Sequence, residues 1–403
     1  MKNTLKTIGY FILSSLLWPC FFAEAGTDFD AWKQEFRQEA LKSGVHQATL
    51  DHYLPQMQLL SHVIEQDIKK PEFLQNFWDY TRLRLSQEKI LKGQEMMRTY
   101  PTWLKRVADE YGVEPQYLVA LWGMETNYGG YLGKTKLLNS LGSLAYHPRR
   151  RSYFTKELIA YFKILESEPY PPVWGSWDGG FGNFQFMPTT FEAYAVDADG
   201  NGSKSLISSM PDSFASAANF LRAMGWKQGQ IWGREVLLPE NFNWEKLHME
   251  KQSVSDWVKL GVRPVHERIF PENELSIQAR LLTPQGADGP FFLAYPNFDY
   301  LRRWNGLELY GLTTGLLADV LAGYRDAHAY PDDFEPIRTE TVIQMQEILA
   351  QKGYYKGAPD GKLGPQTRAA LKAFQKDNAL IQDGYPNKET LLKIITYRKE
   401  LKK

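Results

Sequence analysis

Cysteine is almost absent from this sequence, since Cys20 is the only one among 403 residues. No disulfide can form within the chain, so its fold must be stable through the hydrophobic core alone. Hydrophobic residues make up 43% of the sequence, which is enough for such a core. At this length we expect two or three structural units rather than one.

An excess of charge of either sign is also lacking. Lys and Arg together number 47 and so do Asp and Glu, which gives a formal net charge of zero. With no long basic stretch, the sequence argues against a nucleic-acid partner. The seven histidines are scattered, and neither a zinc motif nor a Ser/His/Asp set stands out. Aromatic residues are abundant instead, and their flat rings can fill a core or cover sugar faces.

A long hydrophobic run occurs at the N-terminus, at residues 8–22. It follows Lys2 and Lys6 and is too short for a comfortable membrane span. Small residues at positions 23 and 25 are the ones that a signal peptidase reads, so residues 1–25 are predicted to be a signal peptide. Cleavage after residue 25 would deliver the chain to the periplasm.

Two other interpretations of the N-terminus remain, an uncleaved anchor and lipidation at Cys20. The short run and Pro19 argue against the anchor. A lipoprotein signal needs a small residue just before the cysteine, whereas Pro19 and Trp18 precede it here. Cleavage would remove the only cysteine, and the exported chain would contain no thiol.

The remaining chain divides by pattern. Apolar residues three and four apart predict amphipathic helices from residue 29 to about 111. Short apolar runs broken by Pro and Gly predict an irregular subdomain with strands at 226–300, followed by a helix near 307–324. We predict a mainly α protein, with a catalytic domain at 26–329, a linker rich in proline and acidic residues at 330–336, and a small domain of about 65 residues at 337–403.

One glutamate lies in a pattern that favours acid catalysis. Pro115 suits the first turn of a helix, and Gly129-Gly130 suits its end. Between them, four residues at i, i+3, i+4 and i+7 share one face: Leu118, Leu121, Trp122 and Glu125. A carboxyl group on this apolar face would have a raised pKa and could donate a proton near neutral pH. The alternative is a glutamate that turns to solvent or pairs with an arginine.

A second cluster spans residues 175–190. Four glycines within eight positions allow a backbone to approach a ligand closely. Neutral polar groups alternate there with aromatic rings, a combination that suits an uncharged polyol such as a sugar: Ser176, Asn183 and Gln185 with Trp177, Phe181, Phe184 and Phe186. The structural alternative is a tight turn ahead of a helix capped by Thr189 or Thr190.

These motifs resemble the membrane-bound lytic murein transglycosylase B family. The resemblance is carried by residues 123–129, 146–150 and 175–191, and continues through 194–200, 216–220, 225–226 and 304–305. It covers about residues 29–325 in order. It implies a lysozyme-like α+β fold and non-hydrolytic cleavage of the β-1,4 bond between N-acetylmuramic acid and N-acetylglucosamine.

The resemblance also implies roles for individual residues. The catalytic glutamate of the family maps onto Glu125, which would protonate the glycosidic oxygen and then accept the proton of the muramic acid C6 hydroxyl. That hydroxyl closes on C1 to give a 1,6-anhydro ring, so one carboxylate suffices and no catalytic cofactor is needed. The substrate-binding residues implied are Ser176, Gln185, Trp304, Asn305 and Tyr310. Trp177, from the aromatic cluster at 175–190, is predicted to bind substrate as well.

One position departs from the family pattern. Asp178 follows Ser176 and Trp177 where the family usually has alanine. Near Glu125, this carboxylate would raise the pKa of Glu125 by like-charge repulsion. It could also position a water molecule and make the enzyme a hydrolase. The sequence pattern alone favours a third interpretation, a solvent-facing aspartate in a turn.

A calcium loop is indicated further along the chain. Asp197, Asp199 and Asn201 place oxygen donors at positions one, three and five of the loop, with glycine at six. Serine occupies position twelve, where a glutamate is expected, but Asp212 aligns with a later aspartate that some family members use. Structural calcium and an Asx-turn without metal are both compatible with this pattern.

The C-terminal 68 residues resemble the small helical peptidoglycan-binding domain of cell-wall enzymes. An internal echo supports this, because Asp360-Gly and Asp383-Gly are each followed seven residues after the aspartate by Thr367 or Thr390. Such a domain would raise the local substrate concentration without changing the chemistry. The alternative is a three-helix module with another ligand.

The leading hypothesis is therefore a periplasmic lytic transglycosylase that binds peptidoglycan glycan strands. A muramidase that hydrolyses the same bond and a catalytically silent wall-binding scaffold are the alternatives. Proteins of cell-wall synthesis or division are candidate partners. We expect His147, Arg149 and Arg150 to support the active-site region rather than to perform chemistry.

Overall fold

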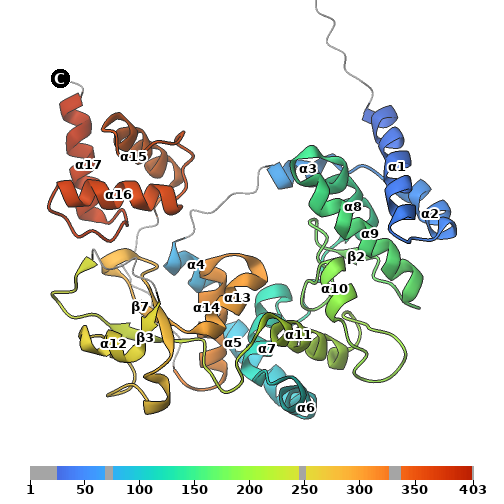
Figure 1. Cartoon of the computed structure of the whole chain (residues 1–403), viewed down its shortest axis with the longest axis horizontal. Coiled ribbons are helices and arrows are strands. Elements are labelled where there is room, and N and C mark those ends of the chain that lie inside the picture. Colours follow the sequence, from blue (N-terminus) through green and yellow to red (C-terminus); the bar gives the residue numbers. More distant parts are fainter. Residues whose placement is uncertain (1–24, 69–75, 245–250, 326–336, 402–403) are drawn as a thin grey trace, which may run out of the picture.

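The computed structural model describes residues 25–68, 76–244, 251–325 and 337–401 (Figure 1). Helices predominate, and the described strands form a two-stranded ribbon and a five-stranded sheet. Positions 1–24 of the predicted signal peptide and the whole predicted linker lie outside the described residues. Within the described ranges, no helix is both long and apolar enough to cross a membrane.

The predicted helical region at 29–111 is confirmed. Its ends follow local rules: the side chains of Asn76 and Ser86 accept backbone N–H groups at the starts of two helices, and Gly112 ends another with φ 71°. The helices are α1 (Ala25–Lys42), α2 (Gln47–Tyr53), α3 (Ser61–Ile68), α4 (Phe77–Arg84), α5 (Gln87–Thr99) and α6 (Pro101–Tyr111).

Helix α7 (Pro115–Thr126) begins at the predicted proline but ends three residues before Gly129. It stops there because Asn127 and Tyr128 adopt left-handed backbone conformations, with φ of 52° and 59°. Their N–H groups bind carbonyls in the last turn of the helix. The prediction of a single apolar face understates the burial of this helix, because its side chains are buried on nearly all sides.

Helices from distant parts of the sequence enclose α7. It packs against α14 (Glu308–Leu321) on one side and against α5 and α6 on others. The predicted helix near 307–324 is thus confirmed, with slightly shorter bounds. The remaining helices of this region are α8 (Leu137–Tyr146), α9 (Arg151–Ser167), α10 (Pro188–Tyr194), α11 (Met210–Met224) and α13 (Pro296–Asn305).

Arg149 and Arg150 connect the segment after α8 to helix α3. Both bind the buried carboxylate of Asp67 in α3, and Arg149 Nη1 also donates to the Asp67 carbonyl at 2.7 Å. Burial raises the pKa of Asp67, but the two guanidinium groups outweigh it and hold this pKa below its usual value. The arginines thus have a structural role, which is to brace the packing of α3 beside α8. Their support of the active-site region stays a prediction.

The predicted irregular subdomain contains an antiparallel sheet with its own hydrophobic core around Trp257 and Tyr295. The strand order is β4-β6-β7-β3-β5, and α12 (Val254–Lys259) packs beside it. The strands are β3 (Gly233–Leu237), β4 (Gln252–Ser253), β5 (Arg263–Pro264), β6 (Gln278–Leu282) and β7 (Phe291–Ala294). The two-stranded ribbon, β1 (Thr135–Lys136) with β2 (Trp174–Gly175), lies elsewhere, next to the glycine-rich segment.

The C-terminal helices α15 (Thr339–Gln351), α16 (Pro365–Asp377) and α17 (Lys388–Leu401) share a separate core. The internal echo has a structural basis. Buried Gln346 donates to Asp360 and Thr367, while Gln375 donates in the same way to Asp383 and Thr390. Each glutamine also accepts a backbone N–H from the glycine after the aspartate, so two equivalent polar networks hold this domain together.

This C-terminal domain is docked onto the rest of the chain (Figure 1). The Asp383 carboxylate accepts the backbone N–H of Ala287 at 2.8 Å, and the Tyr385 hydroxyl donates to the Gln285 side chain at 2.8 Å. Gln285 in turn accepts the N–H of Phe77 at the start of α4. The two bonds of Gln285 are buried and the bond of Asp383 is partly buried, so the domain has a fixed place in addition to any tethering role.

Candidate active site

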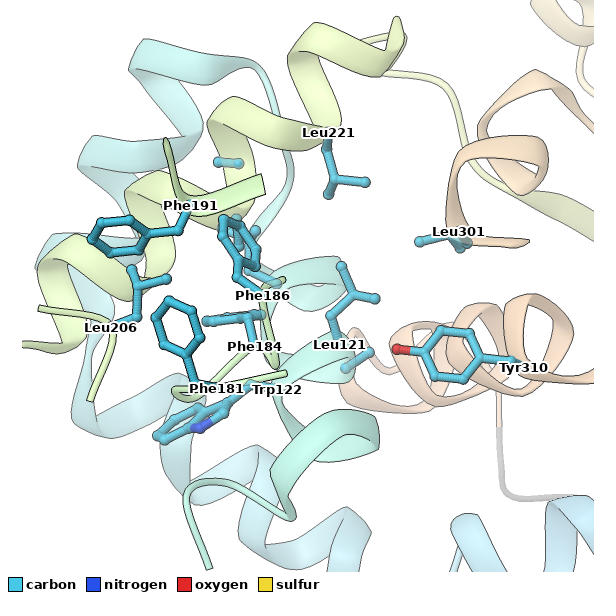
Figure 2. Close-up of a cluster of buried hydrophobic side chains, with 14 of the residues drawn as sticks. Leu121, Trp122, Phe181, Phe184, Phe186, Phe191, Leu206, Leu221, Leu301 and Tyr310 are labelled. Carbon is cyan, nitrogen blue, oxygen red and sulfur yellow. The ribbon is translucent and has the colours of Figure 1, made fainter. Parts of the chain in front are cut away.

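The glycine-rich segment at 175–190 divides into residues that build the core and residues that face a cleft. Phe181, Phe184 and Phe186 are at most 2% exposed and point into the core with Phe191 (Figure 2). The expectation that these three phenylalanines offer stacking surface to a sugar is therefore wrong. Their packing fixes the path of the segment instead.

Asn183 is likewise structural. It is 3% exposed, accepts the indole N–H of Trp122 at 2.9 Å and donates to the Leu206 carbonyl at 3.0 Å. The sequence also misplaced the helix cap that follows. Helix α10 starts at Pro188, and the carboxylate of Glu157 accepts the backbone N–H and the hydroxyl of Thr189.

Glycine is required at position 133, where the chain just before β1 contacts this segment. A Cβ on Gly133, whose φ is +96°, would lie 2.0 Å from the backbone of Gly175 and 2.4 Å from the nitrogen of Ser176. Two backbone segments therefore pack directly against each other at this point. That contact sets the position of Ser176 and, through a 3.4 Å bond to the Leu132 carbonyl, of Gln185.

A cleft of about 830 Å³ gathers six of the seven residues predicted for catalysis and substrate binding. They come from the end of α7, the glycine-rich segment and the end of α13: Glu125, Ser176, Trp177, Gln185, Trp304 and Asn305. The neutral polar groups and two indole rings suit an uncharged glycan. The charged side chains of Arg84, Asp178 and Lys362 line the same cleft.

The pKa of the Glu125 carboxyl group is unusually high. Burial raises its pKa from 4.5 to about 7, and the nearby carboxylate of Asp178 adds to the rise. Hydrogen bonds from Tyr310 and Trp304 favour the charged form and limit it. At neutral pH both the acid and the carboxylate are therefore well populated, as a group that first donates and then accepts a proton requires.

Tyr310, the seventh predicted residue, lies behind Glu125 rather than along the cleft. It is 3% exposed, and its hydroxyl donates to Glu125 Oε1 at 2.5 Å. Figure 2 shows this hydroxyl directed toward the helix that carries Leu121. The geometry makes Tyr310 a positioning residue for the carboxyl group.

Asp178 is half-buried in the cleft and not the solvent-facing residue that its pattern favoured. Its Oδ1 accepts the Ser176 hydroxyl at 2.7 Å. The first interpretation, a carboxylate near enough to raise the pKa of Glu125, is the one that the geometry supports.

Several cleft residues were not anticipated from the sequence. Tyr80 and Arg84 come from α4, with the Arg84 guanidinium 3.7 Å from the centre of the Tyr80 ring. Tyr153 comes from α9, and residues 362–364 belong to the C-terminal domain. No local motif marks these residues, because only the packing of distant segments brings them to the cleft.

The predicted calcium ligands come from the loop at 197–201 and from Asp212 in the first turn of α11. Carboxylate oxygens of Asp197, Asp199 and Asp212 are within 4.8 Å of one another, and the side-chain oxygen of Asn201 accepts the N–H of Ser203. Burial raises the pKa of Asp212, although three backbone N–H groups act in the opposite direction. An all-oxygen donor set of this kind fits a hard cation such as calcium. The same N–H bonds also fit an Asx-turn, so the geometry suits both interpretations.

The site holds a carboxyl group with a pKa near 7 among groups that can bind a glycan, in a mainly helical α+β fold. These are the features expected of a lysozyme-like enzyme with a single acid/base. This chain is accordingly a lytic transglycosylase by class. The transglycosylase SLT domain family matches residues 28–319, and the chain belongs to that family. A peptidoglycan binding domain family matches residues 338–394.

Related proteins support this assignment. SltB3 from Pseudomonas aeruginosa, solved in complex with NAG-anhNAM-pentapeptide, is 36% identical with a TM-score of 0.84, and the match covers 91% of this chain and 99% of that one. Membrane-bound lytic murein transglycosylase B of Escherichia coli is 28% identical over 298 residues, 70% of this chain and 80% of the relative. The E. coli lytic transglycosylase Slt35, solved with calcium, is 27% identical with a TM-score of 0.61, over 73% of this chain and 93% of that one.

Opposite changes in the pH profile are expected from two substitutions beside Glu125. Asp178→Asn removes a negative charge, lowers the pKa of Glu125 and moves the alkaline limb of kcat/KM to lower pH. Tyr310→Phe removes a bond that favours the carboxylate and moves the same limb to higher pH. Asp109→Asn, an exposed position in α6, is the control. Shifts in the same direction for both variants would contradict this assignment.

Proposed function

We propose that this chain cleaves the glycan strands of peptidoglycan as a lytic transglycosylase, with Glu125 as its only acid/base. The observation that carries the proposal is the Glu125 carboxyl group, whose pKa burial raises to about 7 in the same cleft as Ser176 and Gln185. An ordinary glycosidase uses two carboxyl groups, one as the acid and the other as a base or a nucleophile. A group with this pKa can do both in turn.

The reaction follows from that acidity. Protonated Glu125 gives its proton to the glycosidic oxygen, which leaves as the 4-hydroxyl of N-acetylglucosamine. The resulting carboxylate then takes the proton of the muramic acid C6 hydroxyl, whose oxygen bonds to C1 and closes the 1,6-anhydro ring. No water is consumed, and the nucleophile benefits from being part of the same sugar.

The remaining cleft residues bind and orient the sugars in this proposal. Ser176 donates its proton to Asp178, so its lone pairs can accept an N–H or O–H group of the substrate. Gln185 and Asn305 offer further neutral hydrogen-bonding groups. The rings of Trp177 and Trp304 offer apolar faces for the sugars.

Hydrolysis of the same bond is the second candidate. Asp178 is a second carboxylate in the cleft, and a muramidase could use such a group to activate water. Its Oδ1 is already bound to Ser176, which favours a positioning role. A relative at 36% identity was solved with an anhydro ligand, which also supports the non-hydrolytic reaction.

Replacement of the acid tests the function directly. We expect Glu125→Gln to lower turnover of purified sacculi by two to four orders of magnitude, since a positioned general acid or base contributes about 10²–10⁴. Mass spectrometry of the wild-type digest should find muropeptides ending in anhydro-muramic acid. The matched control is Glu95→Gln, at an exposed position in α5.

Three outcomes separate the candidates. Reducing ends in the wild-type digest would identify a muramidase. Full activity of Glu125→Gln would remove this residue from the mechanism. A wild-type chain that binds sacculi but releases no fragments would identify a wall-binding scaffold.

We also propose that Asp197, Asp199, Asn201 and Asp212 hold a structural calcium ion. The support is an all-oxygen donor set from the 197–201 loop and the first turn of α11, together with the relative Slt35, solved with calcium. Binding to the folded state alone would raise Tm with calcium concentration. We expect this rise for the wild type and its loss in Asp199→Asn, measured by calorimetry. An identical Tm with calcium and with a chelator would argue for the metal-free turn.

Export to the periplasm is proposed on the same footing. Peptidoglycan is an extracytoplasmic polymer, and the first 25 residues have the pattern of a cleaved signal peptide. The exported chain should begin at Gly26, which its mass would establish; an N-terminus at Met1 would argue against cleavage. Partner proteins of wall synthesis or division stay a prediction from sequence.

A further inference from the structure

A second cavity adjoins the catalytic cleft. It measures about 670 Å³ and lies between the docked C-terminal domain and the segments that carry α4 and α13. Tyr80, Leu307 and Leu363 line both this cavity and the cleft around Glu125. The two spaces therefore meet at a shared wall, and a branched substrate in the cleft can extend into the second cavity.

The lining of this interdomain cavity is more apolar than that of the cleft. Apolar side chains prevail, contributed by both domains. Three charged side chains line the space with them: Arg302 from α13, Arg368 from α16, and Glu308 from α14, whose carboxylate is bound by Arg280. The Nε of Arg302 is buried and finds no hydrogen-bond partner among the described residues. A buried donor without an acceptor is costly, so the described residues leave part of the hydrogen-bonding capacity of Arg302 unsatisfied.

An uncharged glycan does not account for such a lining. Sugar hydroxyls call for neutral polar partners, whereas guanidinium groups match carboxylates in geometry and charge. The muramic acid of peptidoglycan carries a short peptide with free carboxylates and aliphatic side chains. That peptide hangs from the same sugar whose glycosidic bond would lie beside Glu125.

We propose that the interdomain cavity binds the stem peptide of the substrate, with Arg302 and Arg368 on its carboxylates and the apolar walls on its aliphatic side chains. This rests on the proposed function of the cleft. The volume suits a short peptide, since ligand sites typically measure about 300–1,000 Å³. The docked C-terminal domain supplies one wall, so it is a part of the substrate site as well as an anchor.

Paired substrates test the cavity. Two glycan strands of equal length are used, one with stem peptides and one stripped of them. The cleavage of each is measured for the wild type, Arg302→Gln and Arg368→Gln. We expect kcat/KM for the peptide-bearing strand to fall roughly ten-fold, as loss of a charge-assisted hydrogen bond implies, with the stripped strand unchanged. Arg303→Gln is the matched control, because Arg303 is exposed on the same helix and does not line the cavity.

A second variant separates the cavity from the folding of α13. Ala369→Trp fills the space from the exposed side of α16 and should reproduce the selective loss. Equal loss on both strands, or no loss on either, overturns the proposal. Binding to the Glu125→Gln chain, measured by calorimetry, distinguishes this result from a failure of the proposed reaction. In the Glu125→Gln chain, adding Arg302→Gln should weaken binding of the peptide-bearing strand and leave binding of the stripped strand unchanged.

Discussion

The burial of one carboxyl group at the end of α7 is the constraint on which the site depends. Tyr310, Asp178 and Trp304 approach Glu125 from distant parts of the sequence, and its burial, with Asp178 nearby, raises its pKa to about 7. The bond from Tyr310 limits the rise and fixes the direction of the carboxyl group. A more exposed position would leave a carboxylate that cannot protonate an oxygen, and a wholly apolar one would leave an acid that cannot take a proton back.

The glycine-rich segment serves this constraint in two ways. Its phenylalanines fill the core beneath the cleft, while Ser176, Trp177 and Gln185 line the cleft itself. Glycines at close backbone contacts let both sets occupy one short stretch. Core packing and substrate recognition are therefore coupled, and a change in one would move the other.

The C-terminal domain adds a second level of organisation. Its paired glutamine networks make it a stable unit, and Asp383 belongs to one network while also binding Ala287 across the domain interface. The same aspartate thus supports the fold of the domain and its docking. Because residues 362–364 reach the cleft, the docked position of the domain shapes the space available to a peptidoglycan strand.

The sequence by itself determined the helical regions, the strand-containing subdomain, the three C-terminal helices and the resemblance that leads to the family. Helical and strand periodicities and long motifs are local properties, so they can be recognised along the chain. Only the tertiary structure decided that Phe181 and Asn183 are core residues, that Tyr310 lies behind Glu125, and that Asp178 faces the cleft. The physical reason is that burial, and with it the pKa of a carboxyl group, depends on neighbours far away in sequence. The interdomain cavity has the same origin, since its two walls come from segments that become adjacent only when the C-terminal domain docks.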